Sequence, residues 1–313
     1  MNLKKHNHYK KADFFIFLCI TSFCSFVFLW SVSSSFSNFF DFYVYNDYIL
    51  NGTYLARFAR EPVSAFLMHT VNYFNFSADF YYFICVLFFL LCMQFFSWSY
   101  FRSSWGIFFF GLFLFNPSTL ILIQTPRYLL AFSFFVLATS HLLKSQLFYV
   151  IIFLILSILS HTAGGLISLA FLSMFLLRPV FQYFALVLSL LIFYVILQGG
   201  SEFFEMYATY EGTEHDRGFG RLLVAIFSFC FSVFLFRGAS QFRYFLYILM
   251  ATVMAMFLMT PYAHRIFTYI VFFSFLYFCS NANSNYFRYL ALLILSIFIF
   301  SFSFIILNSM YGY

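Results

Sequence analysis

Two arginines are the residues best placed to bind an anion in this chain. Arg127 follows Thr125-Pro126 and Arg265 follows a turn that begins at Pro261, so each arginine begins an apolar run. A charge at the start of a membrane-spanning helix is costly unless it is paired or functional. Because guanidinium is a planar fork that binds phosphate oxygens in pairs, we expect Arg127 and Arg265 to bind a phosphate or pyrophosphate group.

His161 and Glu61 are the candidate acid–base groups. His161 ends an apolar run, and the small residues at 163–165 would let a helix or a substrate approach closely. Histidine is the side chain best suited to proton transfer near neutral pH, although a histidine hydrogen-bonded between helices is the alternative. Glu61 precedes Pro62, and this pair is typical of a helix N-terminus.

The remaining charges separate across the predicted topology. All five lysines fall on the inner side, whereas the outer side holds six arginines and no lysine. Besides the two arginines above, the outer side receives Arg57, Arg60, Arg217 and Arg221. The alternative is that these arginines pair with the nine acids of the same side and stabilise loops.

Two tyrosine-rich segments on the outer side are candidates for sugar recognition, because aromatic rings pack on sugar faces and carboxylates accept from hydroxyls. The residues concerned are Asp41, Tyr43, Asp47 and Tyr48 in the first segment, Tyr207 and Tyr210 in the second, and Tyr262 and His264 beside Arg265. The loop 198–220 begins with two glycines and could act as a lid. Tyrosines also gather at membrane interfaces without any ligand, and a solvated acidic loop is equally compatible.

The composition indicates that helices in a membrane position these residues. The chain is 64% hydrophobic and 8% charged, with a mean hydropathy of +0.92, whereas soluble domains carry about 25% charged residues. Continuous apolar runs exclude the alternating pattern of an outer-membrane barrel. We therefore predict an all-α polytopic membrane protein forming a single transmembrane domain over 1–313. The net charge of +6 reflects inner loops and predicts no nucleic-acid partner.

A bilayer core needs roughly 20 apolar residues per helix, and the hydrophobic runs predict about eleven spans on that basis. A further stretch, 62–76, is short for a span and is interpreted as a re-entrant or interfacial helix. The predicted spans are 14–32, 80–101, 105–123, 128–143, 147–160, 164–177, 180–197, 221–236, 244–260, 265–280 and 289–308.

The basic tail 1–13 is expected to stay in the cytoplasm. The segments 33–79 and 198–220 are then the first and second outer segments. All six cysteines fall inside apolar runs without a Cys-x-x-Cys or Cys/His cluster, so neither a metal nor another cofactor is expected.

Several short motifs follow one another in a recognisable order. Arg60-Glu61-Pro62 comes first, Asn116-Pro117 then precedes Arg127, Ser-x-x-Ser-His-Thr-Ala follows at 157–163, and Arg265 opens a late span. Over about 40–280 this order resembles the EpsG-like group of bacterial polysaccharide polymerases, which includes Wzy-type O-antigen and capsule polymerases. That group usually has Gln after the first arginine and Gly after Glu-Pro, where this chain has Tyr128 and Val63.

The resemblance implies a metal-independent GT-C-type glycosyltransferase in the bacterial inner membrane, with its active face toward the periplasm. It would join oligosaccharide repeat units carried on undecaprenyl pyrophosphate, and its further partners would be membrane lipids, a chain-length regulator and a flippase. Arg127 and Arg265 would bind the pyrophosphate with Arg57 and Arg60 in support, and His161 or Glu61 would be the base. An O-antigen ligase, a flippase or other transporter, and a membrane acyltransferase are the alternatives.

Overall fold

The computed structural model of the chain describes residues 11–39, 41–162, 164–165, 168–169, 172, 268–269, 271–273, 275–276, 279 and 292–301. The chain divides into two compact units, and the described residues up to 165 and from 271 onward belong to the first. In the second unit, Ser168 Oγ and Tyr269 OH lie 2.9 Å apart. All regular structure in the described residues is helical, as predicted.

Three of the described helices have the length and composition to cross a membrane. They are α1 (Lys11–Ser33, with its candidate span at Asp13–Ser33), α4 (Ala78–Phe101) and α7 (Pro126–Leu143). α1 exposes large apolar side chains such as Phe15, Phe23 and Trp30, which suits contact with lipid. The predicted spans 14–32, 80–101 and 128–143 are therefore confirmed as helices to within a few residues.

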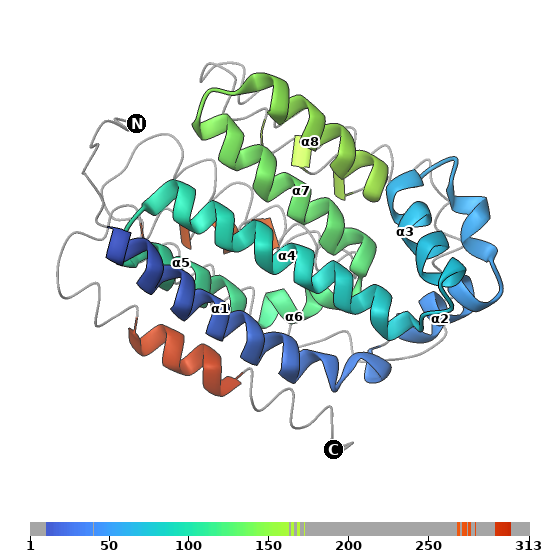
Figure 1. The fold of residues 1–313 in the computed structure, drawn as a ribbon, viewed down its shortest axis with the longest axis horizontal. Coiled ribbons are helices and arrows are strands. Elements are labelled where there is room, and N and C mark those ends of the chain that lie inside the picture. The colour runs from blue at the N-terminus through green and yellow to red at the C-terminus, as the bar shows by residue number, and fades with distance from the viewer. Residues whose placement is uncertain are drawn as a thin grey trace, which may run out of the picture. The chain divides into compact units, whose positions relative to one another are not determined.

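These helices pack as a bundle with two shorter apolar ones, α5 (Ser104–Leu114) and α8 (Leu147–Ser160). α4 lies between α1 and α7, α5 packs on α1 and α4, and α8 packs on α7 (Figure 1). The bounds of α8 match the predicted 147–160. A further apolar helix, 292–301, lies within the predicted span 289–308. The predicted spans 180–197, 221–236 and 244–260 lie outside the described residues, as do most of 164–177 and half of 265–280.

The predicted continuous span 105–123 is wrong. The chain forms two helices there, α5 and α6 (Pro117–Gln124), which are separated at Phe115 and Asn116. Pro117 has no N–H, and its ring disfavours helical backbone at the preceding residue. The Thr119 hydroxyl donates to the Phe113 carbonyl at 2.5 Å and satisfies one of the groups that the break leaves without a helical partner.

Phenylalanine rings fill the core of the first unit. The ring of Phe272 lies within 5.1–5.8 Å, centroid to centroid, of six other phenylalanine rings of the described residues, those of Phe96, Phe109, Phe113, Phe132, Phe135 and Phe273. Aromatic pairs at such separations stabilise a core beyond their area burial. These phenylalanines therefore serve helix packing.

The segment between α1 and α4 forms a small helical layer at one end of the bundle (Figure 1). It contains the 3₁₀ helices η1 (Phe36–Asn38) and η2 (Thr53–Arg57) and the α-helices α2 (Phe42–Leu50) and α3 (Pro62–Tyr73). α3 packs on α8 and α4, and α2 packs on α3 and α4. The predicted short helix 62–76 is thus confirmed from its first residue, whereas the helix α2 was not predicted.

Candidate active site

Glu61 and Arg127 form a nearly buried ion pair where this layer meets the bundle. Arg127 Nη1 donates to Glu61 Oε2, and the two side chains are only 12% and 10% exposed. Each residue is fixed by the start of a helix, because Glu61 directly precedes Pro62 of α3 and Arg127 follows Pro126 of α7. Removing one partner of a buried pair typically costs about 3–5 kcal/mol, so each charge is essential to the other.

Tyr45 holds the other edge of the same guanidinium. Arg127 Nε donates to the Tyr45 hydroxyl at 2.9 Å, and the guanidinium carbon lies 5.5 Å from the centre of the tyrosine ring. Burial raises the pKa of Tyr45 to about 12, and the positive charge of Arg127 opposes that rise only in part. The phenol is therefore neutral at physiological pH and accepts a hydrogen bond from Arg127 through its oxygen.

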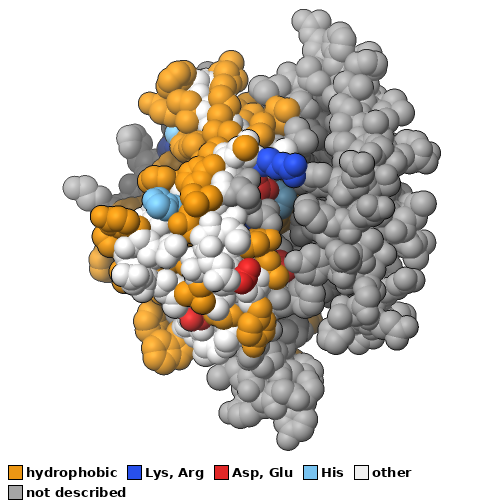
Figure 2. All heavy atoms as spheres, turned by 90° about the vertical axis from the view of Figure 1, so that its right-hand side faces the viewer, with side chains coloured by type: hydrophobic (Ala, Val, Ile, Leu, Met, Phe, Trp, Pro, Cys, Tyr) orange, Lys and Arg blue, Asp and Glu red, His pale blue; other side chains and the backbone are white. Residues whose placement is uncertain are grey.

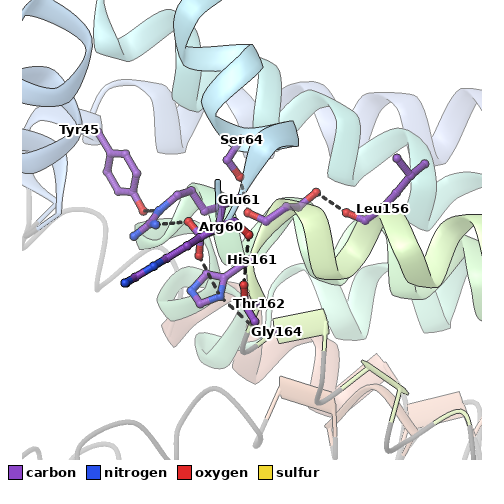
Figure 3. Close-up of polar contacts among 10 residues, drawn as sticks. Tyr45, Arg60, Glu61, Ser64, Leu156, His161, Thr162 and Gly164 are labelled. Carbon is purple, nitrogen blue, oxygen red and sulfur yellow. Dashed lines mark hydrogen bonds and ion pairs between the residues drawn. The ribbon is translucent and has the colours of Figure 1, made fainter. Parts of the chain in front are cut away.

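His161 completes the cluster from α8. α8 ends at Ser160, and His161 continues in extended backbone, which turns its imidazole toward Glu61 (Figure 3). Its Nδ1 lies 3.7 Å from Glu61 Oε1, beyond hydrogen-bond distance but within the range of an ion pair when the ring is protonated. The Gly164 amide donates to the same nitrogen at 3.4 Å, and the Tyr128 ring packs edge-on at 5.7 Å.

Hydroxyl groups fasten the three helices that carry the cluster. The Ser64 hydroxyl on α3 donates to the Ser160 carbonyl at the end of α8. Thr162 Oγ1 donates to the Arg60 carbonyl at 3.3 Å, and Ser157 Oγ donates to the Ala131 carbonyl of α7 at 2.8 Å. Glu61, Arg127 and His161 therefore sit on elements whose mutual positions are fixed within this unit.

The small residues after His161 allow the close approach that the sequence suggested. A Cβ atom on Gly164 would lie 2.9 Å from Cδ2 of Tyr128 and 3.0 Å from Cβ of Ala131. These separations are too short for real side chains. Glycine at 164 therefore lets the segment after α8 lie directly against α7, beside His161.

The predicted residues divide into those the structure joins and those it does not. Glu61, Arg127 and His161 meet, and the exposed Arg60 directly precedes Glu61 in the chain. Figure 2, which faces α2 and α3, shows basic, acidic and histidine side chains meeting in one patch of this surface. The side chain of Arg57 and the residues Arg265, Tyr207, Tyr210, Arg217, Arg221, Tyr262 and His264 lie outside the described part of the chain.

The acids and tyrosines of α2 are placed differently from one another. Tyr43 is 72% exposed and Asp47 is also exposed, with its carboxylate accepting from Asn51 Nδ2 at 2.5 Å. Tyr48 packs edge-on against Tyr45, at 6.0 Å between ring centroids. Asp41 lies just before α2, half-buried, and its charge adds to the rise in the pKa of Tyr45.

Sequence reasoning missed Tyr45 and gave Tyr128 no role. The signal for Tyr45 was the helical spacing of Phe42, Tyr45 and Ile49, the three buried residues of α2. That spacing puts Tyr45 on the buried face and Tyr43 on the exposed one. Within the described ranges, no group of three or more His, Cys, Asp and Glu side chains could hold a metal ion.

The fold and this cluster together define a membrane-embedded helical protein with a guanidinium, a carboxylate and an imidazole gathered at one set of helix ends. The chain belongs to the EpsG family, whose model matches residues 14–313. EpsG-like proteins are similar to Wzy-type polysaccharide polymerases, which supports a membrane function of the polysaccharide polymerase kind. No curated protein and no solved structure gives a significant match.

Proposed function

We propose that this protein is a Wzy-type polymerase of a bacterial surface polysaccharide such as O-antigen. It transfers a growing glycan from undecaprenyl pyrophosphate to a new lipid-linked repeat unit at the periplasmic face of the inner membrane, in a bundle of GT-C type. The observation that carries the proposal is the buried Glu61–Arg127 pair with His161 beside it, in a chain of the EpsG family. The flippase alternative is less well supported, because this cluster lies at helix ends rather than at mid-span.

The reaction exchanges one bond to the anomeric carbon for another. The acceptor hydroxyl oxygen bonds to the anomeric carbon of the donor, the bond from that carbon to the pyrophosphate oxygen breaks, and the lipid pyrophosphate leaves with the bonding electrons. The acceptor proton must go to a base. We assign that role to His161, because Glu61 Oε1 at 3.7 Å is placed to stabilise the imidazolium that forms.

Glu61 then acts as the group that positions both of its neighbours. One of its oxygens holds Arg127 and the other faces His161. A carboxylate that bridges a guanidinium and an imidazole fixes the orientation of both, as in other catalytic sites where a third group orients the base. Glu61 as the base itself remains the alternative.

The ion pair changes what is required of the other arginines. Since Glu61 neutralises Arg127, the pair alone offers a pyrophosphate little net positive charge. Additional cations must stabilise the charge that develops on the leaving group. We assign this task to Arg265, with support from Arg60 and Arg57, while Arg127 contributes the directed N–H groups of its fork.

Deletion in the producing cell tests the proposed function. A cell without the polymerase should cap its surface lipid with a single repeat unit, and the wild-type gene should restore long chains. Long chains that persist after deletion would refute the proposal. Complete loss of attached repeat units would instead indicate a ligase. Complementation with Arg265→Lys, at normal protein level, should leave chains at one unit because an ammonium cannot bind two phosphate oxygens as a fork does.

A further inference from the structure

A second polar cluster lies further along α3, and the active site does not use it. Asn72 Nδ2 donates to the Tyr54 hydroxyl at 3.2 Å, and the same hydroxyl lies 3.0 Å from His69 Nδ1. Tyr54 belongs to η2 and is buried, with 4% of its surface exposed, whereas His69 is exposed. The cluster therefore joins a buried hydroxyl to an imidazole on the surface.

The hydrogen-bond chain fixes which nitrogen of the neutral His69 ring carries the proton. The Tyr54 oxygen accepts from Asn72, and a buried hydroxyl hydrogen needs an acceptor. His69 Nδ1 is the acceptor that the described residues supply, so Tyr54 donates to Nδ1. The proton of the imidazole then resides on Nε2, for which the described residues supply no partner. His69 presents an oriented N–H donor at the surface.

Aromatic rings surround this donor. The ring centroids of Tyr54, Phe58 and Tyr73 lie 5.8, 6.5 and 6.5 Å from that of His69. Tyr73, one turn further along α3, is 73% exposed. A ring face beside an oriented N–H donor suits a sugar, whose C–H face packs on the ring while a hydroxyl oxygen accepts the hydrogen bond.

The position of the cluster fits a polymeric substrate. α3 begins at Pro62, directly after Glu61, and carries His69 seven residues later. A helix rises by 1.5 Å per residue, so His69 lies roughly 10 Å along the axis from the candidate active site. A glycan whose reacting end is at Glu61 and His161 would reach His69 with a neighbouring sugar.

We propose that His69, oriented by Tyr54 and Asn72 and flanked by Tyr73, is a saccharide subsite for the repeat unit. This inference rests on the proposed function, since it takes the substrate to be a glycan. Exposed aromatics at this layer also suit an anchor in the lipid interface, but an anchor does not require a hydrogen-bonded chain that orients a histidine.

Binding of free oligosaccharide tests the subsite separately from catalysis. The probe is the repeat-unit oligosaccharide released by mild acid from the cell's own lipid-linked intermediates, titrated against the full-length protein in lipid nanodiscs. His69→Ala and Tyr73→Ala should each weaken binding at least tenfold. His69→Gln retains an N–H donor and should recover most of the loss. Tyr54→Phe should give an intermediate loss, because the His69 imidazole remains but the hydroxyl that orients it is gone.

Phe66→Ala is the matched control, because Phe66 is 63% exposed on the same helix and makes no ring contact with His69 in the described part of the chain. It should leave binding within twofold of wild type. Equal losses in Phe66→Ala and His69→Ala would show an interfacial anchor and overturn the subsite, as would normal binding by His69→Ala or absent binding by wild type. The wild-type protein could also bind the oligosaccharide through His69 and yet fail to restore long chains in the deletion cell. That result would support the subsite and refute the proposed polymerase.

Discussion

Nδ1 of His161 lies 3.7 Å from Oε1 of Glu61, whose other oxygen accepts a hydrogen bond from Arg127. One carboxylate thus joins an imidazole from the end of α8 to a guanidinium from the start of α7. The three residues are far apart in the sequence, and only the packing of α3 on α8 and of α8 on α7 brings them together. The carboxylate is therefore the structural centre of the site, and it provides the most direct tests.

Arg127→Lys should lower chain extension at least tenfold while the protein level stays normal. An ammonium is a compact point charge and cannot reproduce the two directed contacts that the fork makes with Tyr45 and Glu61. Glycan length on gels, with immunoblotting for protein level, measures this. Arg102→Lys, at the end of α4, is the control and should extend chains within twofold of wild type. Chains of normal length in Arg127→Lys would show that the planar guanidinium is not required at this position.

Glu61→Gln should destabilise the protein, because it leaves the Arg127 charge buried without its counter-ion, at a cost of about 3–5 kcal/mol. Arg127→Met should also destabilise, but the double variant should lose much less than the sum of the two. Thermal unfolding of the purified protein in detergent gives the four values of this double-mutant cycle. Additive losses would show that the two side chains do not act as a pair in the folded protein.

The sequence predicted the helices better than it predicted the contacts between their side chains. The starts of α3 and α8 and the three long helices follow from prolines and apolar runs, because these signals are local. The pairing of Glu61 with Arg127 spans 66 residues and leaves no local signal. The order Arg60-Glu61-Pro62 and Thr125-Pro126-Arg127 suggested that both residues matter, but not that they bind each other.

Two errors have identifiable physical causes. The break between α5 and α6 falls inside a predicted span because residues 105–123 are apolar throughout most of their length, and apolarity outweighed the turn signal of Asn116-Pro117 in the prediction. Tyr45 was missed because 41–48 was interpreted as a tyrosine-rich outer segment, and no helix was predicted there. As a helix, the same residues place Tyr45 inward and Tyr43 outward, so the helical period would have distinguished the two tyrosines.

The stability of the protein should depend on Tyr45 at alkaline pH. Burial raises the pKa of its phenol from 10.0 to about 12, so the folded state holds this proton more tightly than the unfolded state. The resulting stability is fully present below pH 10 and is lost as the pH rises toward 12. The free energy of unfolding of wild type should therefore fall relative to that of Tyr45→Phe between pH 10 and 12. Parallel curves over that interval would contradict the assignment.

Gly164→Ala should impair chain extension by displacing His161. The added Cβ would lie 2.9–3.0 Å from Tyr128 and Ala131, so the segment after α8 must move away from α7 and carry His161 with it. We expect at least a tenfold loss of extension with protein still in the membrane. Gly164→Ala combined with Tyr128→Ala removes the nearest obstacle and should restore part of the activity. Wild-type activity in the single variant would show that the segment tolerates displacement.

The orientation in the membrane can be tested with cysteines placed at opposite ends of the bundle. In a chain whose native cysteines are replaced, Tyr43→Cys should react with an impermeant maleimide added outside the inner membrane. Lys144→Cys, just after α7, should react only after permeabilisation. Tyr43 is 72% exposed, so its reactivity depends on the side of the membrane and not on burial. The reverse pattern would place the candidate active site in the cytoplasm.

The hydroxyl contacts between α3 and α8 bear on how a polymer could advance. Ser64 binds the end of α8 and the Arg60 carbonyl accepts from Thr162, so the layer that carries Glu61 and His69 is anchored beside His161. For the proposed polymerase, we therefore expect the glycan to move rather than this layer. The glycan would then move along α3 by one repeat unit per cycle while α3 keeps its position.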